Sequence, residues 1–227
     1  MLQTESVRKP LWDLLKDLQK EEALENYFLV GGTALALQLG HRMSDDIDLF
    51  TKNDINKDEI FNFLNENYYG EYQIHNIQNI ILQISIKGIK VDFAKYDYIL
   101  LENVKSEEGI KYLGKKDISA MKLMAIANRG DQAKDFIDIY YLLKEISLKD
   151  MFECYKRKYN QNDISTVKRS LVYFDDVTES NWSSVTLLKD TLPMEKVKQA
   201  IVNEVNNYVK TLSSLSVLPT ICSLVVL

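Results

Sequence analysis

Apolar residues recur at strand spacing in much of the first half of this chain and at helical spacing in most of the second half. From Asp117 to about Lys210 they repeat every three or four residues between charged positions, which predicts helices. We therefore predict an α+β fold, with a mixed sheet flanked by helices in residues 1–110 and a helical domain in residues 111–227. The predicted strands cover residues 27–30, 46–51, 72–77, 80–87 and 89–96.

Residues that commonly end or begin helices support this division. A helix over residues 33–39 is expected to end at Gly40, which readily adopts a left-handed conformation. Asn56 is followed three residues later by a glutamate, which resembles a capping box for a helix over residues 57–67. Leucines at positions 11, 14, 15 and 18 predict an earlier helix within residues 8–26. Two later helices are expected over residues 118–128 and 132–144, with Asp117 and Asp131 as their caps.

Composition excludes several classes of protein. The chain has 227 residues, 46% hydrophobic and 27% charged, which is typical of a folded globular protein. The net charge of −5 gives no overall basic field for nucleic acid, although a local basic surface remains compatible with it. Two cysteines and two histidines at unrelated positions do not form a zinc-binding pattern. The polar first ten residues contain no secretory signal, so we expect a cytoplasmic protein.

The end of the chain is apolar and carries no charge after Lys210. A membrane-spanning helix needs about 20 apolar residues. This segment is shorter, contains Pro219 and includes several serines and threonines. We therefore expect it to pack on the protein or on a partner, with no membrane association.

The candidate chemistry begins with a glycine pair, Gly31-Gly32, and two aspartates, Asp46 and Asp48. The glycines precede a predicted helix, and the aspartates lie two apart on a predicted strand, so both carboxylates face the same way. Glycines at a helix N-terminus allow backbone N–H groups to approach a phosphate. Carboxylates are the ligands that Mg²⁺ prefers. The combination favours phosphoryl or nucleotidyl transfer.

A third carboxylate is available on a neighbouring predicted strand. In residues 89–94 the apolar positions alternate, so Asp92 faces the side opposite to the core residues. If this strand pairs with residues 46–50, Asp92 joins Asp46 and Asp48, and three carboxylates suit two Mg²⁺ ions. Taken alone, Asp92 is equally compatible with a solvated strand-end residue.

Two segments around the glycines and aspartates resemble the AbiEii/AbiGii toxin family of the nucleotidyltransferase superfamily. They read GGTAL at residues 31–35 and GHRMSDDIDLF at residues 40–50. The superfamily pattern is a hydrophobic residue, Gly, and Gly or Ser, followed after about a dozen residues by Asp-hydrophobic-Asp. The resemblance implies a nucleotidyltransferase core domain in residues 1–110, with Mg²⁺ as cofactor and an NTP as substrate.

The resemblance extends to about residue 143 through later helical segments. They read MKLMAI at residues 121–126 and KDFIDIY at residues 134–140. In the family a lysine and an aspartate from these helices complete the active site, and the matching residues are Lys122 and Asp135. Asp138 lies one turn after Asp135 and is an alternative. Independently, Lys122 is one of two polar residues on an otherwise apolar stretch, where its charge can face a triphosphate.

Residues near the glycine pair are candidates for nucleotide binding. Thr33 and Ser44 have hydroxyl groups that can donate hydrogen bonds to phosphate oxygens. Arg42 can bind phosphate or pair with the neighbouring Asp45. His41 is as compatible with a structural hydrogen bond as with a function. The full set of candidate nucleotide-binding residues is Gly31, Gly32, Thr33, Arg42, Ser44 and Lys122.

The resemblance implies the toxin of a bacterial toxin–antitoxin or abortive-infection pair, with a cognate antitoxin as partner. Such an enzyme moves a nucleoside monophosphate from an NTP to an acceptor hydroxyl, and relatives that modify tRNA ends favour tRNA as acceptor. Residues 105–134 contain seven Lys or Arg against four Asp or Glu, which is compatible with an RNA-facing surface. Alternatives are a kinase, an enzyme that nucleotidylates small molecules, and an NTP-binding module without turnover.

Overall fold

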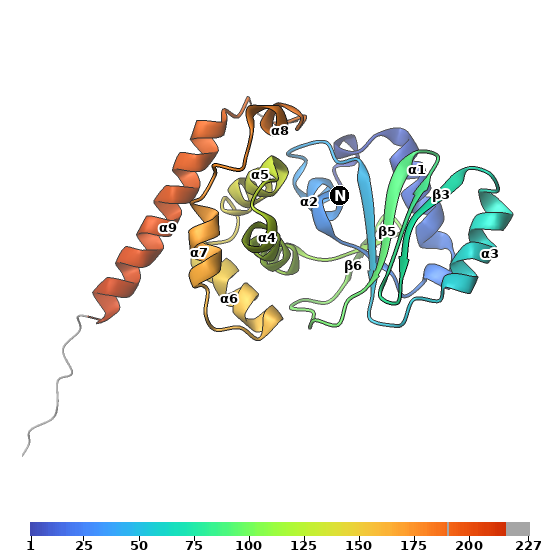
Figure 1. Cartoon of the computed structure of the whole chain (residues 1–227), viewed down its shortest axis with the longest axis horizontal. Helices are drawn as coiled ribbons and strands as arrows, with labels where there is room; N and C mark the ends of the chain where they lie inside the picture. Colours follow the sequence, from blue (N-terminus) through green and yellow to red (C-terminus); the bar gives the residue numbers. More distant parts are fainter. Residues whose placement is uncertain (190, 217–227) are drawn as a thin grey trace, which may run out of the picture.

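A computed structural model of the chain describes residues 1–189 and 191–216, with the backbone alone for residues 214–216 (Figure 1). The apolar C-terminal segment, for which the sequence predicts packing on the protein or a partner, lies mostly outside the described residues. No helix within the described ranges is long and apolar enough to cross a membrane.

Within these residues, seven strands form one mixed sheet in the order β3-β4-β5-β2-β1-β7-β6. The β2–β5 and β1–β7 pairs are parallel, and the other neighbouring strands are antiparallel. The strands are β1 (Phe28–Leu29), β2 (Asp46–Thr51), β3 (Tyr72–Gln78), β4 (Ile81–Ile86), β5 (Ile89–Lys95), β6 (Lys105–Glu107) and β7 (Ile110–Tyr112).

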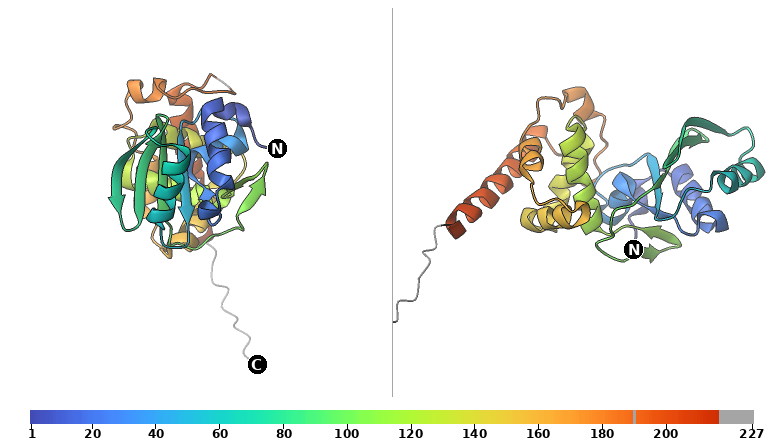
Figure 2. Two further views of the ribbon diagram at one scale, coloured as in Figure 1. Left: turned by 90° about the vertical axis from the view of Figure 1, so that its right-hand side faces the viewer. Right: turned by 60° about the horizontal axis from the view of Figure 1, so that its bottom comes forward.

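Helices lie on both sides of the sheet. Figures 1 and 2 show α1 and α3 against one face and the helices from α4 onward beyond the other. The α-helices are α1 (Lys9–Lys20), α2 (Gly31–Leu39), α3 (Lys57–Asn67), α4 (Lys115–Arg129), α5 (Ala133–Leu142), α6 (Leu148–Tyr159), α7 (Ser165–Leu171), α8 (Glu179–Ser183) and α9 (Met194–Ser216). Short 3₁₀ helices cover Thr4–Ser6 (η1) and Glu22–Leu24 (η2).

Alternation along the central strands separates the core from the site. Ile47 and Leu49 of β2 and Phe93 of β5 are fully buried, with no exposed surface. The four leucines of α1 that recur at helical spacing are also buried. Asp46 and Asp48 alternate with the buried residues of β2 and therefore point to the opposite face. The predicted α+β fold, with a mixed sheet and a helical C-terminal part, is confirmed.

The predicted helix ends are correct in the first half of the chain. Gly40 follows α2 with φ of 62°, and the Asn56 side chain accepts a hydrogen bond from the Glu59 backbone N–H at 3.3 Å. The helix expected over residues 33–39 begins two residues earlier, at Gly31, so the glycine pair belongs to its first turn.

The predicted caps of the two later helices are wrong. Because α4 begins at Lys115 and follows Gly114, Asp117 lies inside its first turn. Asp117 is fully buried and accepts hydrogen bonds from the Leu101 N–H at 3.0 Å and the Lys158 ammonium at 2.5 Å. Helix α5 follows Gln132, with no side-chain cap from Asp131. Asp117 instead fixes the preceding loop and α6 to α4.

The short hairpin of β6 and β7 was not expected from the sequence. It joins the sheet because β7 pairs in parallel with β1, through Leu29 and Tyr112. The division of the chain into domains 1–110 and 111–227 stays a prediction.

Candidate active site

Two neighbouring strands bring the three predicted carboxylates onto one face of the sheet. β2 and β5 are parallel, with Asp48 opposite Asp92 and Asp46 opposite Lys90. Side chains two apart on one strand, and side chains paired across neighbouring strands, share a face. Asp46, Asp48 and Asp92 therefore lie together, as the sequence predicts if these strands are neighbours.

These carboxylates form one wall of a cavity of about 380 Å³. The N-terminus of α2 and the facing surfaces of α4 and α5 form the other walls. The ten predicted site residues all line this cavity: Gly31, Gly32, Thr33, Arg42, Ser44, Asp46, Asp48, Asp92, Lys122 and Asp135. Eight further residues also line it: Val30, Phe50, Lys90, Met121, Ala125, Arg129, Gln132 and Lys134.

The glycine pair makes room for side chains of the site. Gly31 has φ of +68°, and a Cβ atom there would lie 2.5 Å from Oδ2 of Asp48. A Cβ atom on Gly32 would lie 2.5 Å from Nη2 of Arg42. The sequence suggests that these glycines admit a phosphate to the backbone. The structure adds that each glycine also lies close to a charged side chain of the site, and at Gly31 the positive φ is a further reason for glycine.

We expect Gly31→Ala to lower the free energy of unfolding by about 2 kcal/mol or more, as measured by urea denaturation. The new side chain is strained at positive φ and also displaces Asp48. Gly70→Ala is the matched control, because Gly70 has φ of +75° with nothing within 4 Å of its Cβ position. It should lose about 1 kcal/mol through strain alone. Equal losses in the two variants would show that Asp48 moves aside without cost.

Within the described part of the chain, Asp92 is hydrogen-bonded through one of its two oxygens. Its Oδ2 accepts from Nζ of Lys90 at 2.8 Å and from Nε2 of Gln83 at 2.9 Å. Its Oδ1 is buried and has no hydrogen-bond partner among the described residues. A buried oxygen left without a partner is costly unless a cation or a donor completes it.

Asp48 stands beside Asp92 in an environment that disfavours its charge. Burial, and then the negative charge of Asp92, raise the pKa of Asp48 to about 6. Asp46 is more exposed, and its Oδ2 lies 3.5 Å from Nζ of Lys134. The concentrated negative charge and the unpartnered oxygen of Asp92 fit a hard divalent cation such as Mg²⁺. Within the described ranges, no three His, Cys, Asp or Glu side chains already form a metal-binding group.

Lys122 and Arg42 belong to a buried group of charges on the opposite wall. Nζ of Lys122 lies 2.6 Å from Oδ1 of Asp135 and 2.6 Å from Oδ2 of Asp138. Arg42 donates to both oxygens of Asp138, at 2.7 and 2.9 Å. The proposed alternative pairing of Arg42 with Asp45 is wrong, because Arg42 turns inward to α5. Asp135 lines the cavity, whereas Asp138 has no exposed surface and lies behind it.

The charges in this group determine one another's protonation. Burial alone would raise the pKa of Asp138, but Arg42 and Lys122 outweigh it and hold that pKa well below its ordinary value. Burial would lower the pKa of Lys122, and the charges of Asp138 and Asp135 raise it instead. Nε2 of His41 donates to Oδ1 of the ionised Asp138 at 2.7 Å, and burial lowers the pKa of His41, which favours a neutral imidazole. This geometry supports a structural hydrogen bond for His41.

The two predicted hydroxyl groups contact each other, where α2 faces the loop before β2. Oγ1 of Thr33 lies 2.8 Å from Oγ of Ser44 and also bonds to the backbone carbonyl of Asp46. Since Thr33 is 1% exposed and has a single hydroxyl proton, this geometry favours a role in holding the loop. Ser44 is 7% exposed and lines the cavity.

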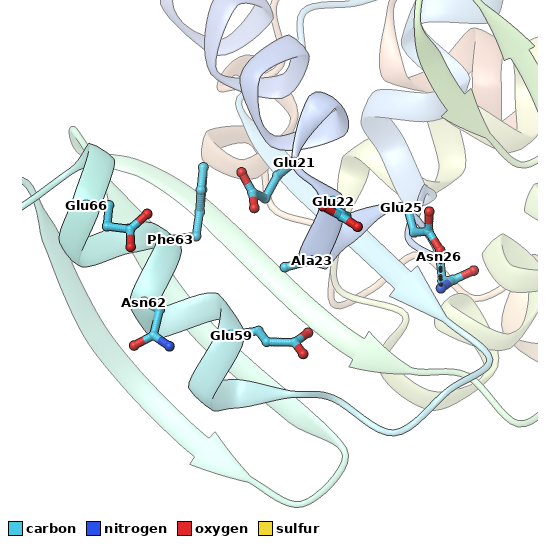
Figure 3. Close-up of a pocket in the computed structure, with 9 residues that line it drawn as sticks. All are labelled: Glu21, Glu22, Ala23, Glu25, Asn26, Glu59, Asn62, Phe63 and Glu66. Atoms are coloured by element: carbon cyan, nitrogen blue, oxygen red, sulfur yellow. Dashed lines mark hydrogen bonds between the residues drawn. The ribbon is translucent and has the colours of Figure 1, made fainter.

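A second hollow lies between η2 and α3, on the other side of the sheet (Figure 3). Among the residues that the structure describes, its lining includes five glutamates and no lysine or arginine: Glu21, Glu22, Glu25, Glu59 and Glu66. An anionic ligand such as a nucleotide would be repelled there. The cavity beside Asp48 combines carboxylates with lysines and arginines, so it is the better candidate for a metal–phosphate substrate.

Comparison with known proteins agrees with this geometry. The sequence model of the family described as "Nucleotidyl transferase AbiEii toxin, Type IV TA system" matches residues 13–203. An uncharacterized protein of Aquifex aeolicus (strain VF5), aq_aa25, is 35% identical over 188 residues, which are 75% of this chain and 90% of that protein.

Two solved structures from Helicobacter pylori have a similar fold. JHP933 is 19% identical with a TM-score of 0.54, and the similarity covers 92% of each chain. A second chain, which is named as a nucleotidyltransferase, is 19% identical with a TM-score of 0.54. The similarity covers 91% of this chain and 95% of that one. At this identity the likeness concerns the fold.

Proposed function

The chain belongs to the AbiEii nucleotidyl transferase toxin family, and from this premise we propose that it transfers a nucleoside monophosphate from an NTP to an acceptor hydroxyl. The observation that carries the proposal is the cavity between the sheet and α4–α5. Three carboxylates from adjacent strands face two buried cations, Lys122 and Arg42, across a space that the glycine turn also borders. This arrangement suits a triphosphate and a metal held at the same place.

In the proposed reaction, the oxygen of the acceptor hydroxyl forms a bond to the α-phosphorus. The bond from the α-phosphorus to the bridging oxygen breaks, and pyrophosphate leaves with the electron pair. The hydroxyl proton would pass to Oδ1 of Asp92, because Oδ2 already accepts two hydrogen bonds and Oδ1 has one lone pair for a metal and one for the proton. Asp46, Asp48 and Asp92 would hold one or two Mg²⁺ ions, which activate the attacking oxygen and neutralise charge on the leaving group.

The cationic residues of the cavity would bind the triphosphate. Lys122 supplies a fixed charge, because Asp135 and Asp138 hold its ammonium group from two sides. Lys90, Arg129 and Lys134 line the more exposed part of the cavity and are additional candidates that the sequence prediction did not include. Phe50, Met121 and Ala125 provide the apolar surface on which a nucleobase can rest.

We propose a cognate antitoxin as the regulator, since the family is described as part of a type IV toxin–antitoxin system. We propose tRNA as the acceptor because of the resemblance to enzymes that modify tRNA ends. The NTP substrate is expected to place the reaction in the cytoplasm.

The position of the transferred label tests the reaction. The purified protein is incubated with Mg²⁺, total cellular RNA and an NTP labelled on either the α- or the γ-phosphate. We expect label on the RNA from the α-position only, and loss of transfer when EDTA removes the metal. Each of the four NTPs is tried, and a small-molecule extract replaces the RNA in a parallel reaction.

Each other outcome identifies a different function. Transfer of the γ-label indicates a kinase, and labelling of the small-molecule extract alone indicates a small-molecule nucleotidyltransferase. Tight NTP binding by calorimetry, without pyrophosphate release on either pool, indicates a binding module.

A further inference from the structure

Two side chains that the sequence prediction did not include, Gln83 of β4 and Lys90 of β5, orient the Asp92 carboxylate. Both donate to Oδ2, at 2.9 and 2.8 Å. The other oxygen, Oδ1, is buried and has no partner among the described residues. The two oxygens of this carboxylate therefore differ. Oδ2 is hydrogen-bonded to the protein, and Oδ1 is available to bind a ligand.

Gln83 belongs to a row of polar side chains that crosses four neighbouring strands. Asn76 of β3 is paired with Gln83 of β4, Gln83 with Asp92 of β5, and Asp92 with Asp48 of β2. The register between β3 and β4 shifts between Ile74 and Asn76, so that one extra residue is present on β3. Bulges of this kind redirect side chains. Here the bulge places Asn76 opposite Gln83.

The Asp92 carboxylate, which can only accept, selects the NH₂ side of the Gln83 amide, and Asn76 supports this orientation. Nδ2 of Asn76 donates to Oε1 of Gln83 at 3.2 Å, which leaves Nε2 of Gln83 to donate to Asp92. If the amide were reversed, its oxygen would face the Asp92 carboxylate and its NH₂ group would face that of Asn76. Hydrogen-bond complementarity therefore selects the orientation in which Gln83 is a donor to Asp92.

We propose that Gln83 and Lys90 are positioning residues that hold Asp92 through Oδ2 and leave Oδ1 as the oxygen for the catalytic metal. This inference rests on the proposed function, since it assigns a metal to the site. Residues that hydrogen-bond to a metal ligand fix its orientation, and replacing them commonly weakens metal binding or activity by about 10- to 100-fold. Lys90 also carries a charge that can attract the triphosphate, whereas Gln83 is neutral and can act only through Asp92 or Asn76.

The chain offers a matched control on the same strand. Lys95 of β5 forms an ion pair with Asp54 at 2.7 Å, much as Lys90 does with Asp92. Lys95 lies outside the cavity, so its replacement removes the same chemical group from the same strand without touching the site. A difference in Mn²⁺ affinity or kcat between Lys90→Met and Lys95→Met is therefore caused by the position of Lys90 beside Asp92.

The experiment compares Gln83→Leu, Lys90→Met, Lys90→Arg and Lys95→Met with the wild type. Mn²⁺ affinity is measured by electron paramagnetic resonance with a bound non-hydrolysable NTP, and kcat and KM are measured for α-label transfer. For Gln83→Leu we expect about 10-fold weaker Mn²⁺ binding, a kcat lower by about 10- to 100-fold, and a KM for NTP within about threefold. Lys90→Met should show the same losses, together with a higher KM. Lys90→Arg should recover most of the Mn²⁺ affinity, and Lys95→Met should match the wild type.

Crystal structures of Gln83→Leu and Lys95→Met provide a readout that needs no activity. The Asp92 carboxylate should change its rotamer in Gln83→Leu and keep it in Lys95→Met. The inference is overturned if Gln83→Leu binds Mn²⁺ as the wild type does, or if the wild type binds none. Mn²⁺ binding without transfer of label by the wild type would refute the proposed function alone, and the affinities of the variants would still decide this inference.

Discussion

Asp48→Asn is expected to abolish nucleotidyl transfer and to make the metal-free protein more stable at neutral pH. The change removes a carboxylate from the proposed metal site, and we expect transfer to fall at least about 1,000-fold. The stability gain has a separate cause. Burial, and next the charge of Asp92, raise the pKa of Asp48 in the folded protein to about 6, against about 3.9 in an unfolded chain.

The sign of the stability effect follows from this shift. The folded protein holds the Asp48 proton more tightly than the unfolded chain, so wild-type stability decreases as the pH rises from about 4 to about 6. At pH 7 the ionised side chain then costs on the order of 2 kcal/mol, and asparagine avoids that cost. Thermal melts in EDTA at pH 4 and pH 7 measure the effect. The gain of the variant should be present at pH 7 and much smaller at pH 4.

Asp45→Asn is the control for this prediction. Asp45 lies three residues before Asp48, its side chain is 68% exposed, and its nearest basic group, Nε of Arg8, is 3.9 Å away. The same chemical change there should leave transfer and melting temperature unchanged. Retained transfer by Asp48→Asn would remove this carboxylate from the mechanism, and a lower melting temperature would contradict its unfavourable burial.

The sequence was sufficient to predict that Asp46 and Asp48 lie on one face of a strand, because the signal is local. Asp46 and Asp48 alternate with buried residues on a single strand, and their common face follows from the geometry of any strand. The predicted bounds of β2 and of α3 agree with the structure for the same reason. Asp92 required one further assumption, that its strand pairs with β2, which periodicity alone does not establish.

The remaining contacts of the site depend on residues far apart in the chain. Arg42 and Asp138 are separated by 96 positions, so the neighbouring Asp45 was as reasonable a partner from sequence. Gln83 contacts Asp92 only because β4 and β5 form a hairpin in one particular register. Asp117 looks like a helix cap in sequence, and only the folded loop and α6 bring the Leu101 N–H and Lys158 to it. Such pairings follow from tertiary structure, and local propensity carries no signal for them.

Asp138→Asn is expected to cause the largest loss of stability among single changes in the site, about 3–5 kcal/mol at pH 7. Asp138 is fully buried and neutralises Arg42 and Lys122 at 2.6–2.9 Å. Asparagine has nearly the same shape but no charge, so it leaves the Arg42 guanidinium buried without its counter-ion. Urea denaturation of the two proteins at pH 7 measures the difference. The exposed Asp131, 3.7 Å from Arg129, provides the control Asp131→Asn, which should cost less than about 1 kcal/mol.

The contribution of Asp138 to stability should change with pH in the direction opposite to that of Asp48. Because Arg42 and Lys122 hold the pKa of Asp138 well below its ordinary value, its contribution is present above about pH 4 and decreases as the pH falls further. Asp138→Asn and the wild type should therefore converge in acid. Adding Arg42→Met to Asp138→Asn should recover part of the lost stability, since the double variant no longer buries an unpaired guanidinium. If the double variant loses more free energy of unfolding than the two single variants lose together, Arg42 does not depend on Asp138 for its burial.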